Sequence, residues 1–119
     1  MTPSIGTVSV PVSDQAAASE FYHEMLGYKV SKDAAWGGGS RWLELAPEAG
    51  GVGITLVTWF EAMPPGSLQG LVLYTDDLLG LHSHLTEKGA DVSPLQEQFY
   101  GQFFTLRDPD GNGLVINGR

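Results

Sequence analysis

The stretch VSVPVSDQAAASEFYHEMLGYKV, residues 8–30, decides the fold because it combines a strand, a helix and the start of another strand. Valine alternates with other residues over 8–12, which is typical of one face of a strand. Ser13 and Asp14 then offer helix-capping side chains. A stripe with the spacing i, i+3, i+4 and i+7 follows, as expected for a helix: Ala18, Phe21, Tyr22 and Met25. Gly27 ends the helix, since glycine accepts the left-handed conformation there, and an extended pattern resumes.

The second half of the chain repeats this order. Residues 71–74 read as a strand, Asp76 and Asp77 as caps, and Gly89 as a helix end. The helical stripe between them consists of Leu78, Leu81 and Leu85. Residues 90–92 then resume an extended pattern, as they do in the first half.

Each half closes with two further strands joined by a turn. These strands are predicted at residues 41–45 and 54–59, and at 103–106 and 114–117. The connecting segments contain Pro, Asp-Gly and Asn-Gly, which supply the backbone angles that turns need. The pattern predicts an α+β protein of two βαβββ modules in a single domain: module one at 1–62, module two at 66–119, and a hinge around 63–66.

Composition limits the possible functions. The chain has 119 residues, no cysteine and a net charge of −8 with only six Lys and Arg. Nucleic-acid binding is therefore not expected, because phosphates require clustered cations. No apolar run approaches the ~20 residues that span a bilayer, and no secretory signal is evident. We expect a cytoplasmic protein without membrane contact whose ligand is neutral or cationic, although the acidity alone is also compatible with a role in solubility.

Three segments, in this order, resemble the vicinal oxygen chelate superfamily. They are VPVSD at 10–14, the end of the first predicted helix with FY at 21–22 and LGY at 26–28, and RDPDGN at 107–112. This superfamily includes glyoxalase I, bleomycin-resistance proteins, extradiol dioxygenases and fosfomycin-resistance enzymes. The similarity covers essentially the whole chain. It implies the glyoxalase/bleomycin-resistance/dihydroxybiphenyl dioxygenase-like fold, in which curved mixed sheets with flanking helices form a cavity. The modules pair within one chain or across a homodimer, and a homodimer is expected here.

The resemblance also predicts that no metal or other cofactor is bound. Metal-dependent members place His, Glu or Gln on four strands, and those positions carry over to Thr7, Thr55, Gly70 and Val115. The internal repeat supports the mapping, and this set offers no carboxylate or imidazole. The three histidines, at 23, 82 and 84, lie on predicted helices and are expected to be ordinary surface residues.

Strand alternation separates two sets of side chains. The aliphatic set should pack against the helices: Val8, Val10, Leu43, Leu45, Ile54, Leu56, Leu71, Leu73, Phe104, Leu106, Leu114 and Ile116. The other set should face the cavity and bind a ligand: Thr7, Ser9, Trp42, Glu44, Thr55, Val57, Trp59, Val72, Tyr74, Phe103, Thr105, Val115 and Asn117. Trp36, in a glycine-rich loop, is a candidate lid, and Tyr100, in the loop predicted at 96–101, could face the same cavity. A dimer interface would bury a similar mixture, so that alternative stays open.

Glu44 is the one carboxylate predicted inside the cavity. It could act as a general base, anchor a cationic ligand, or pair with Arg41 or Arg107. The leading hypothesis is a metal-independent protein that binds a small aromatic or cationic compound, similar to bleomycin-resistance proteins and their antibiotic sequestration. The alternatives are a glyoxalase-like enzyme that works without the usual metal, with Glu44 as general base, and a partner-binding domain without a ligand.

Overall fold

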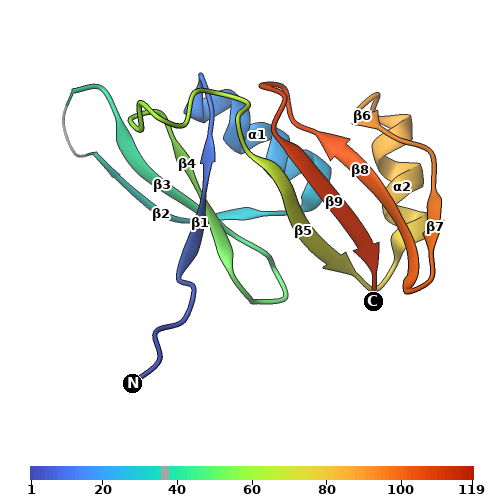
Figure 1. The fold of residues 1–119 in the computed structure, drawn as a ribbon. Helices are drawn as coiled ribbons and strands as arrows, with labels where there is room; N and C mark the ends of the chain where they lie inside the picture. The colour runs from blue at the N-terminus through green and yellow to red at the C-terminus, as the bar shows by residue number, and fades with distance from the viewer. Residues whose placement is uncertain (36–37) are drawn as a thin grey trace. The chain divides into compact units, whose positions relative to one another are not determined.

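The computed structural model describes residues 1–35 and 38–119, so the predicted lid residue Trp36 lies outside the described residues. The chain divides into two compact units, Met1–Pro65 and Gly66–Arg119. Each unit has one helix against a mixed sheet, and together they give the expected α+β class (Figure 1). No helix among the described residues is long and apolar enough to cross a membrane.

Unit 1 consists of β1 (Thr7–Pro11), α1 (Gln15–Leu26), β2 (Lys29–Ala35), β3 (Arg41–Ala46) and β4 (Gly53–Val57). Its strands are ordered β1-β4-β3-β2, with β1 parallel to β4 and the other pairs antiparallel. The helix lies behind the sheet in Figure 1, where it contacts β4 and β2. The sheet therefore has one face toward α1 and one face away from it, which we call the open face.

The ends of α1 are those that the sequence predicts. Asp14 is the N-cap, and its Oδ1 accepts a hydrogen bond of 3.1 Å from the backbone of Ala17. Gly27 ends the helix in the left-handed region with φ of 75°, a conformation that costs other residues energy. Ala18 and Tyr22 of the predicted stripe are buried. The helix thus lies with its apolar side against the sheet.

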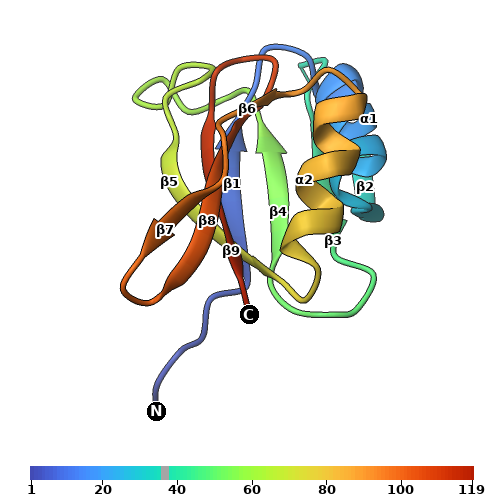
Figure 2. The same ribbon diagram turned by 90° about the vertical axis from the view of Figure 1, so that its right-hand side faces the viewer.

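Unit 2 repeats this plan with one additional strand. It consists of β5 (Gln69–Thr75), α2 (Leu78–Glu87), β6 (Asp91–Val92), β7 (Gln96–Gln98), β8 (Gly101–Arg107) and β9 (Gly113–Gly118). The strand order is β5-β9-β8-β6, and β7 pairs with β8. Helix α2 contacts β6, β8 and β9, as can be followed in Figure 2. The face of this sheet turned away from α2 is the open face of unit 2.

The strand registers show how closely the two units correspond. Val8 and Ser9 of β1 pair with Ile54 and Thr55 of β4. In unit 2, Leu71 and Val72 pair in the same parallel manner with Leu114 and Val115. The aliphatic residues expected to face the helices are all buried or half-buried. Nine of these twelve side chains belong to the buried core, while Val8, Leu71 and Leu73 are only half-buried.

Strand β2, whose end the sequence pattern does not predict, continues to Ala35, because β3 pairs with it along its length. Two predicted boundaries were wrong. Strand β4 ends at Val57 rather than at residue 59, so Trp59 follows the strand. The segment predicted as a loop at 96–101 begins with strand β7, which forms a tight hairpin with β8. Its Gln-Glu-Gln sequence has no apolar alternation, since all three residues are exposed at a sheet edge.

Candidate functional site

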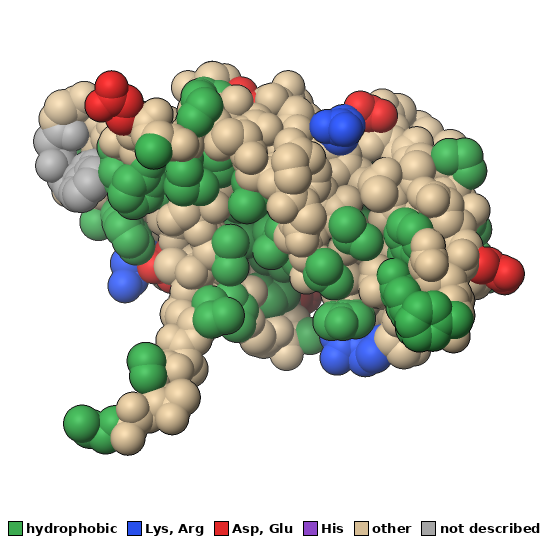
Figure 3. All heavy atoms as spheres, in the orientation of Figure 1, with side chains coloured by type: hydrophobic (Ala, Val, Ile, Leu, Met, Phe, Trp, Pro, Cys, Tyr) green, Lys and Arg blue, Asp and Glu red, His purple; other side chains and the backbone are tan. Residues whose placement is uncertain are grey.

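The open face of unit 1 carries most of the residues predicted to bind a ligand. Ser9 pairs with Thr55, Thr55 with Glu44, and Glu44 with Lys32. Residues directly opposite each other in a sheet share a face, so these four side chains form one row across the strands. In Figure 3, hydrophobic side chains gather on the visible face of unit 1 where β3 and β4 lie. The face thus combines polar groups with a large apolar area.

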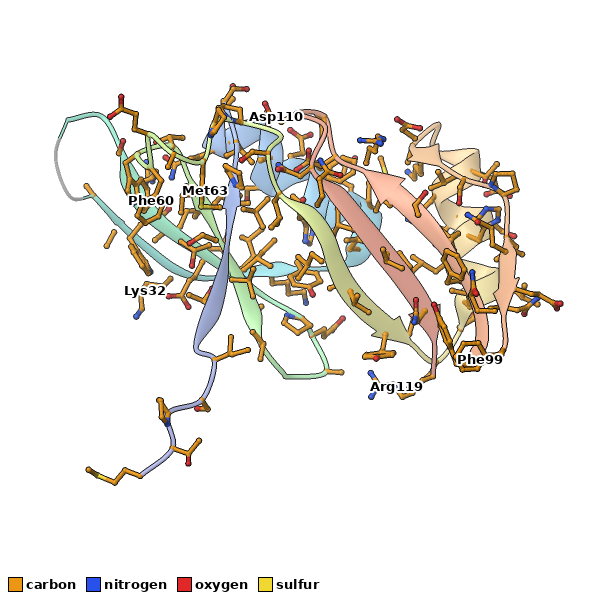
Figure 4. All side chains as sticks on the ribbon, in the orientation of Figure 1. Lys32, Phe60, Met63, Phe99, Asp110 and Arg119 are labelled. Atoms are coloured by element: carbon orange, nitrogen blue, oxygen red, sulfur yellow. The ribbon has the colours of Figure 1, made fainter. Side chains whose placement is uncertain are left out.

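An aromatic cluster dominates this area. The rings of Trp42 and Trp59 stack with centroids 6.0 Å apart and planes inclined by 29°. Phe60 extends the cluster, with its ring 6.0 Å from that of Trp59, and it is labelled in Figure 4 in the segment after β4. Although Trp59 lies beyond the strand, it still reaches Trp42. Sequence reasoning missed Phe60, because the strand was predicted to continue and alternation would then turn this side chain away.

Glu44 lies beside this cluster and is held by it. The indole Nε1 of Trp42 donates a hydrogen bond of 2.7 Å to Glu44 Oε1. Arg41, one of the two partners suggested among the alternatives for Glu44, instead donates through its guanidinium to Asp33 at 2.6 Å. Arg107, the other suggested partner, donates to the carbonyl of Gly111 at 3.4 Å. The half-buried carboxylate of Glu44 is therefore oriented by an aromatic donor.

The positions that correspond to metal ligands do not fit a divalent metal. Thr7 and Thr55 share a hydrogen bond of 2.8 Å between their hydroxyl groups. Gly70 and Val115 in unit 2 have no donor atoms in their side chains. Within residues 1–35 and 38–119, no three His, Cys, Asp or Glu side chains gather into a group able to hold a metal ion. Divalent metals in proteins favour carboxylate, imidazole and thiolate ligands, and these four residues provide none.

The open face of unit 2 carries the remaining predicted residues. Asn117 of β9 pairs with Tyr74 on one side and with Phe103 on the other. In the next row, Val115 lies between Val72 and Thr105. The Oδ1 atom of Asn117 is buried and has no hydrogen-bond donor among the described residues. Hydrophobic side chains are visible over β5, β9 and β8 in Figure 3.

The other residues predicted to bind a ligand differ in how far their side chains are exposed to solvent. Thr55 and Val57 are buried, to 0% and 1% exposure, whereas Val72 is exposed. Tyr100 is exposed at the turn between β7 and β8, with its ring edge-on to that of Phe99, 5.1 Å away. Figure 4 labels Phe99 at this turn. The turn is thus an exposed aromatic tip.

Two of the three histidines, His23 and His82, form hydrogen bonds with backbone carbonyls. His23 is exposed and donates through Nδ1 to the carbonyl of Tyr28 at 2.8 Å, and His84 is also exposed. His82 is not the expected surface residue: it is half-buried, donates to the carbonyl of Ser93 at 2.8 Å, and lies edge-on to Phe104 with ring centroids 4.8 Å apart.

The surface also has hollows that do not coincide with the aromatic cluster of unit 1. A groove of about 430 Å³ between α1 and β2 is lined by Glu20, His23, Tyr28 and Lys29, among others. Burial raises the pKa of the Tyr28 hydroxyl there. Most of its side chains are exposed, and none was predicted to bind a ligand. A smaller hollow of about 130 Å³ in unit 2 includes Gly70 and Val115.

Comparisons with known proteins identify sequences and folds that are similar to this chain. A sequence model described as the Glyoxalase/Bleomycin resistance protein/Dioxygenase superfamily matches residues 4–116. The uncharacterized protein YetH of Bacillus subtilis is 34% identical over 120 residues, covering 98% of both chains.

Two solved structures from Streptomyces sp. CB03234 are also similar. TnmS3, described as an antibiotic binding protein, is 39% identical with a TM-score of 0.90, and the match covers 98% of this chain and 96% of that one. A glyoxalase/bleomycin resistance protein is 41% identical with a TM-score of 0.86, and the match covers 96% of this chain and 99% of that one.

Proposed function

Because the chain belongs to the glyoxalase/bleomycin resistance protein/dioxygenase superfamily, we propose that it binds and sequesters a small aromatic or cationic compound without using a metal. The observation that carries this proposal is the stacked pair of Trp42 and Trp59 beside the Glu44 carboxylate. The similarity to TnmS3, described as an antibiotic binding protein, supports the same class of function.

The chemistry of the cluster favours a flat ligand with positive charge. Indole faces carry partial negative charge and attract cations with about 0.5–2 kcal/mol. The bond from Trp42 Nε1 keeps the Glu44 carboxylate next to the ring, so a cation over the indole would also lie close to a full negative charge. The net charge of −8 adds a favourable long-range attraction. A hydrophobic compound would gain from the apolar area alone.

A matched pair of compounds tests this proposal. N-methylquinolinium and 1-methylnaphthalene have nearly the same shape but differ by one charge. We expect both to perturb the fluorescence of the tryptophans, with the cation binding more tightly by calorimetry. Glu44→Gln should weaken cation binding about fivefold and leave the neutral compound unaffected. The control is Glu48→Gln, which removes an equal charge from an exposed carboxylate whose partner is Lys29.

Two results would argue against the proposal. Absence of binding across a wider set of aromatic and cationic compounds, with the protein folded, would favour a partner-binding domain. Stoichiometric metal in carefully prepared protein would remove the metal-independent part of the proposal.

An enzymatic role for Glu44 is a second candidate, because one oxygen of this carboxylate is fixed on the open face by Trp42. Glu44→Gln separates the two functions. A variant that binds a converted compound as well as the natural protein does, but no longer turns it over, would support a general base. Unchanged turnover would exclude that role.

A homodimer is also part of the proposal, since a chain of this size buries a modest share of its surface. Sedimentation equilibrium over a wide concentration range would test it directly, and a monomer at all concentrations would contradict it.

A further inference from the structure

The first residue of α1 joins the two strands that carry the tryptophan pair. Gln15 Nε2 donates hydrogen bonds to the backbone carbonyl of Arg41, 2.7 Å away, and to that of Leu56, 2.8 Å away. Arg41 begins β3 directly before Trp42, and Leu56 lies near the end of β4, three residues before Trp59. The two hydrogens of one amide group therefore link the start of β3 to the end of β4.

The backbone ladder between β3 and β4 stops short of the tryptophans. It consists of three pairs, and the last pair at this end joins Leu43 to Leu56. Trp42 and Trp59 both lie beyond that pair, and their rings stack with centroids 6.0 Å apart. Among the described residues, no pair of this ladder sets the spacing of the strands where the two rings meet.

Unit 2 shows how the same end of the sheet is built without such an amide. Its corresponding ladder, between β8 and β9, has five pairs and continues one pair further at this end, to Phe103 with Asn117. The position that corresponds to Gln15, directly after the helix N-cap, is occupied by Leu78, whose side chain has no donor. Unit 2 therefore joins these strand ends through its backbone, whereas unit 1 joins them through the Gln15 side chain.

We propose that Gln15 is a positioning residue, whose amide fixes the separation of β3 and β4 where the rings of Trp42 and Trp59 stack. Helix α1 lies behind the sheet (Figure 1), so Gln15 acts through the strands and does not touch a ligand on the open face. A contact of 3.2 Å between the hydroxyl groups of Ser40 and Thr58 also joins these ends, but water competes for it because it is exposed. The effect of Gln15 on binding rests on the proposed function, while its effect on the tryptophan pair does not.

A spectroscopic measurement reports on the pair without any ligand. Two stacked indoles couple their electronic transitions and give two bands of opposite sign in the far-ultraviolet circular dichroism. The size of this paired signal depends on the distance and the angle between the rings. Trp42→Phe identifies the signal by removing it.

Gln15→Met is the test variant, because methionine keeps the length of the side chain and has no donor. Gln69→Met is the matched control. Gln69 Nε2 also donates to two backbone carbonyls, those of Gly66 and Gly111 at 3.1 Å each, but it does so in unit 2. Thermal unfolding verifies that each variant is folded at the temperature of measurement. If Gln15→Met does not fold, Gln15→Glu carries the same test, since a carboxylate has the same size and cannot donate.

We expect Gln15→Met to lose most of the paired signal. It should also bind N-methylquinolinium and 1-methylnaphthalene about fivefold more weakly, because the aromatic surface is disturbed and not the charge. This result differs from that of Glu44→Gln, which should weaken binding of the cation alone. Gln69→Met should keep both the signal and the two affinities.

Two outcomes would overturn the inference. An unchanged paired signal in the folded Gln15 variant would show that the rings stack without the amide. An equal loss in Gln69→Met would show that the signal follows general destabilisation.

The proposed function can fail separately. If the natural protein binds neither compound, that function is wrong, while loss of the paired signal in Gln15→Met still supports the positioning role. If both compounds bind and the signal does not depend on Gln15, the proposed function stands and this inference does not.

Discussion

At the scale of single residues, the least expected feature is a buried polar pair in the turn before β9. Asp108 and Asn112 are 5% and 0% exposed. Asn112 Nδ2 donates to Asp108 Oδ2 at 2.8 Å, and Asn112 Oδ1 accepts from the backbone of Leu68 at 3.0 Å. The sequence identifies this segment as a turn, but turns are usually exposed, so its burial could not be predicted. The pair ties the turn to the segment that leads into β5.

Asn112→Ala should therefore destabilise the protein strongly. The change leaves the Leu68 amide and the Asp108 carboxylate without these hydrogen bonds in a buried place, and each lost partner is costly. We expect the free energy of unfolding to fall by about 2–3 kcal/mol, measured by urea denaturation. Ser83→Ala, on the exposed side of α2, is the control and should have little effect. Equal stability of the two variants would show that the pair is dispensable.

Tyr28 predicts a specific response to alkaline pH. Burial raises the pKa of its phenol above 10.0, so the folded state binds this proton more tightly than the unfolded state does. The resulting stabilisation is present below pH 10 and is lost as the pH rises through the folded pKa. Tyr28→Phe cannot lose this proton. Urea unfolding at pH 8 and pH 11 should show a smaller alkaline loss of stability in the variant, and identical losses would contradict the prediction.

At the scale of elements, the N-terminus of α2 depends on a glycine. The Asp77 carboxylate caps the helix by accepting from the backbone of Gly80 at 2.9 Å. A methyl group added at Gly80 would collide with that carboxylate. Glycine is otherwise a poor helix residue, about 1 kcal/mol worse than alanine. Capping by Asp77 therefore favours glycine at position 80, whereas helix propensity favours alanine there.

A double-mutant cycle measures this conflict. Gly80→Ala should not stabilise the natural protein, because the new methyl group displaces the cap. In the Asp77→Ala background, which has already lost about 1 kcal/mol of capping, the same change should stabilise the helix. Thermal unfolding of the four proteins gives the coupling. Additive effects would show that the Asp77 side chain moves aside without cost.

The elements also show what the sequence can and cannot predict. Both helices were predicted with the correct N-cap among two candidates and α1 with its terminal glycine, because Asp14, Asp77 and Gly27 act through local backbone geometry, whereas Lys88, the C-cap of α2, was not predicted. Strand β7 was missed, since its polar residues at a sheet edge carry no alternation. The end of β4 was placed too late, because Trp59 continues the apolar pattern after the strand has ended. Local signals were therefore sufficient for the helices, while edge strands depend on their pairing partners.

At the scale of the whole molecule, the duplicated plan was predictable because each half carries the same order of caps, stripes and turns. Alternation also placed Trp42 and Glu44 on one face of β3 correctly. It could not give the contact between them, nor show that Arg41 binds Asp33 instead of Glu44. Trp42 and Glu44 lie on the same strand, whereas Arg41 contacts Asp33 on the neighbouring strand β2, and alternation does not distinguish between these possible partners. A set of candidate residues follows from the pattern of a sequence, but their pairing requires coordinates.

The charge of the whole chain should be visible in the salt dependence of binding. With a net charge of −8, cations are attracted over distances that shrink as the ionic strength rises. Between about 20 mM and about 500 mM NaCl, where the screening length falls severalfold, binding of N-methylquinolinium should weaken markedly. Binding of the neutral 1-methylnaphthalene should not. Glu44→Gln should reduce this salt dependence without removing it, because the remaining charge still acts at long range. Equal salt dependence for the two compounds would mean that the acidity of the chain serves solubility alone.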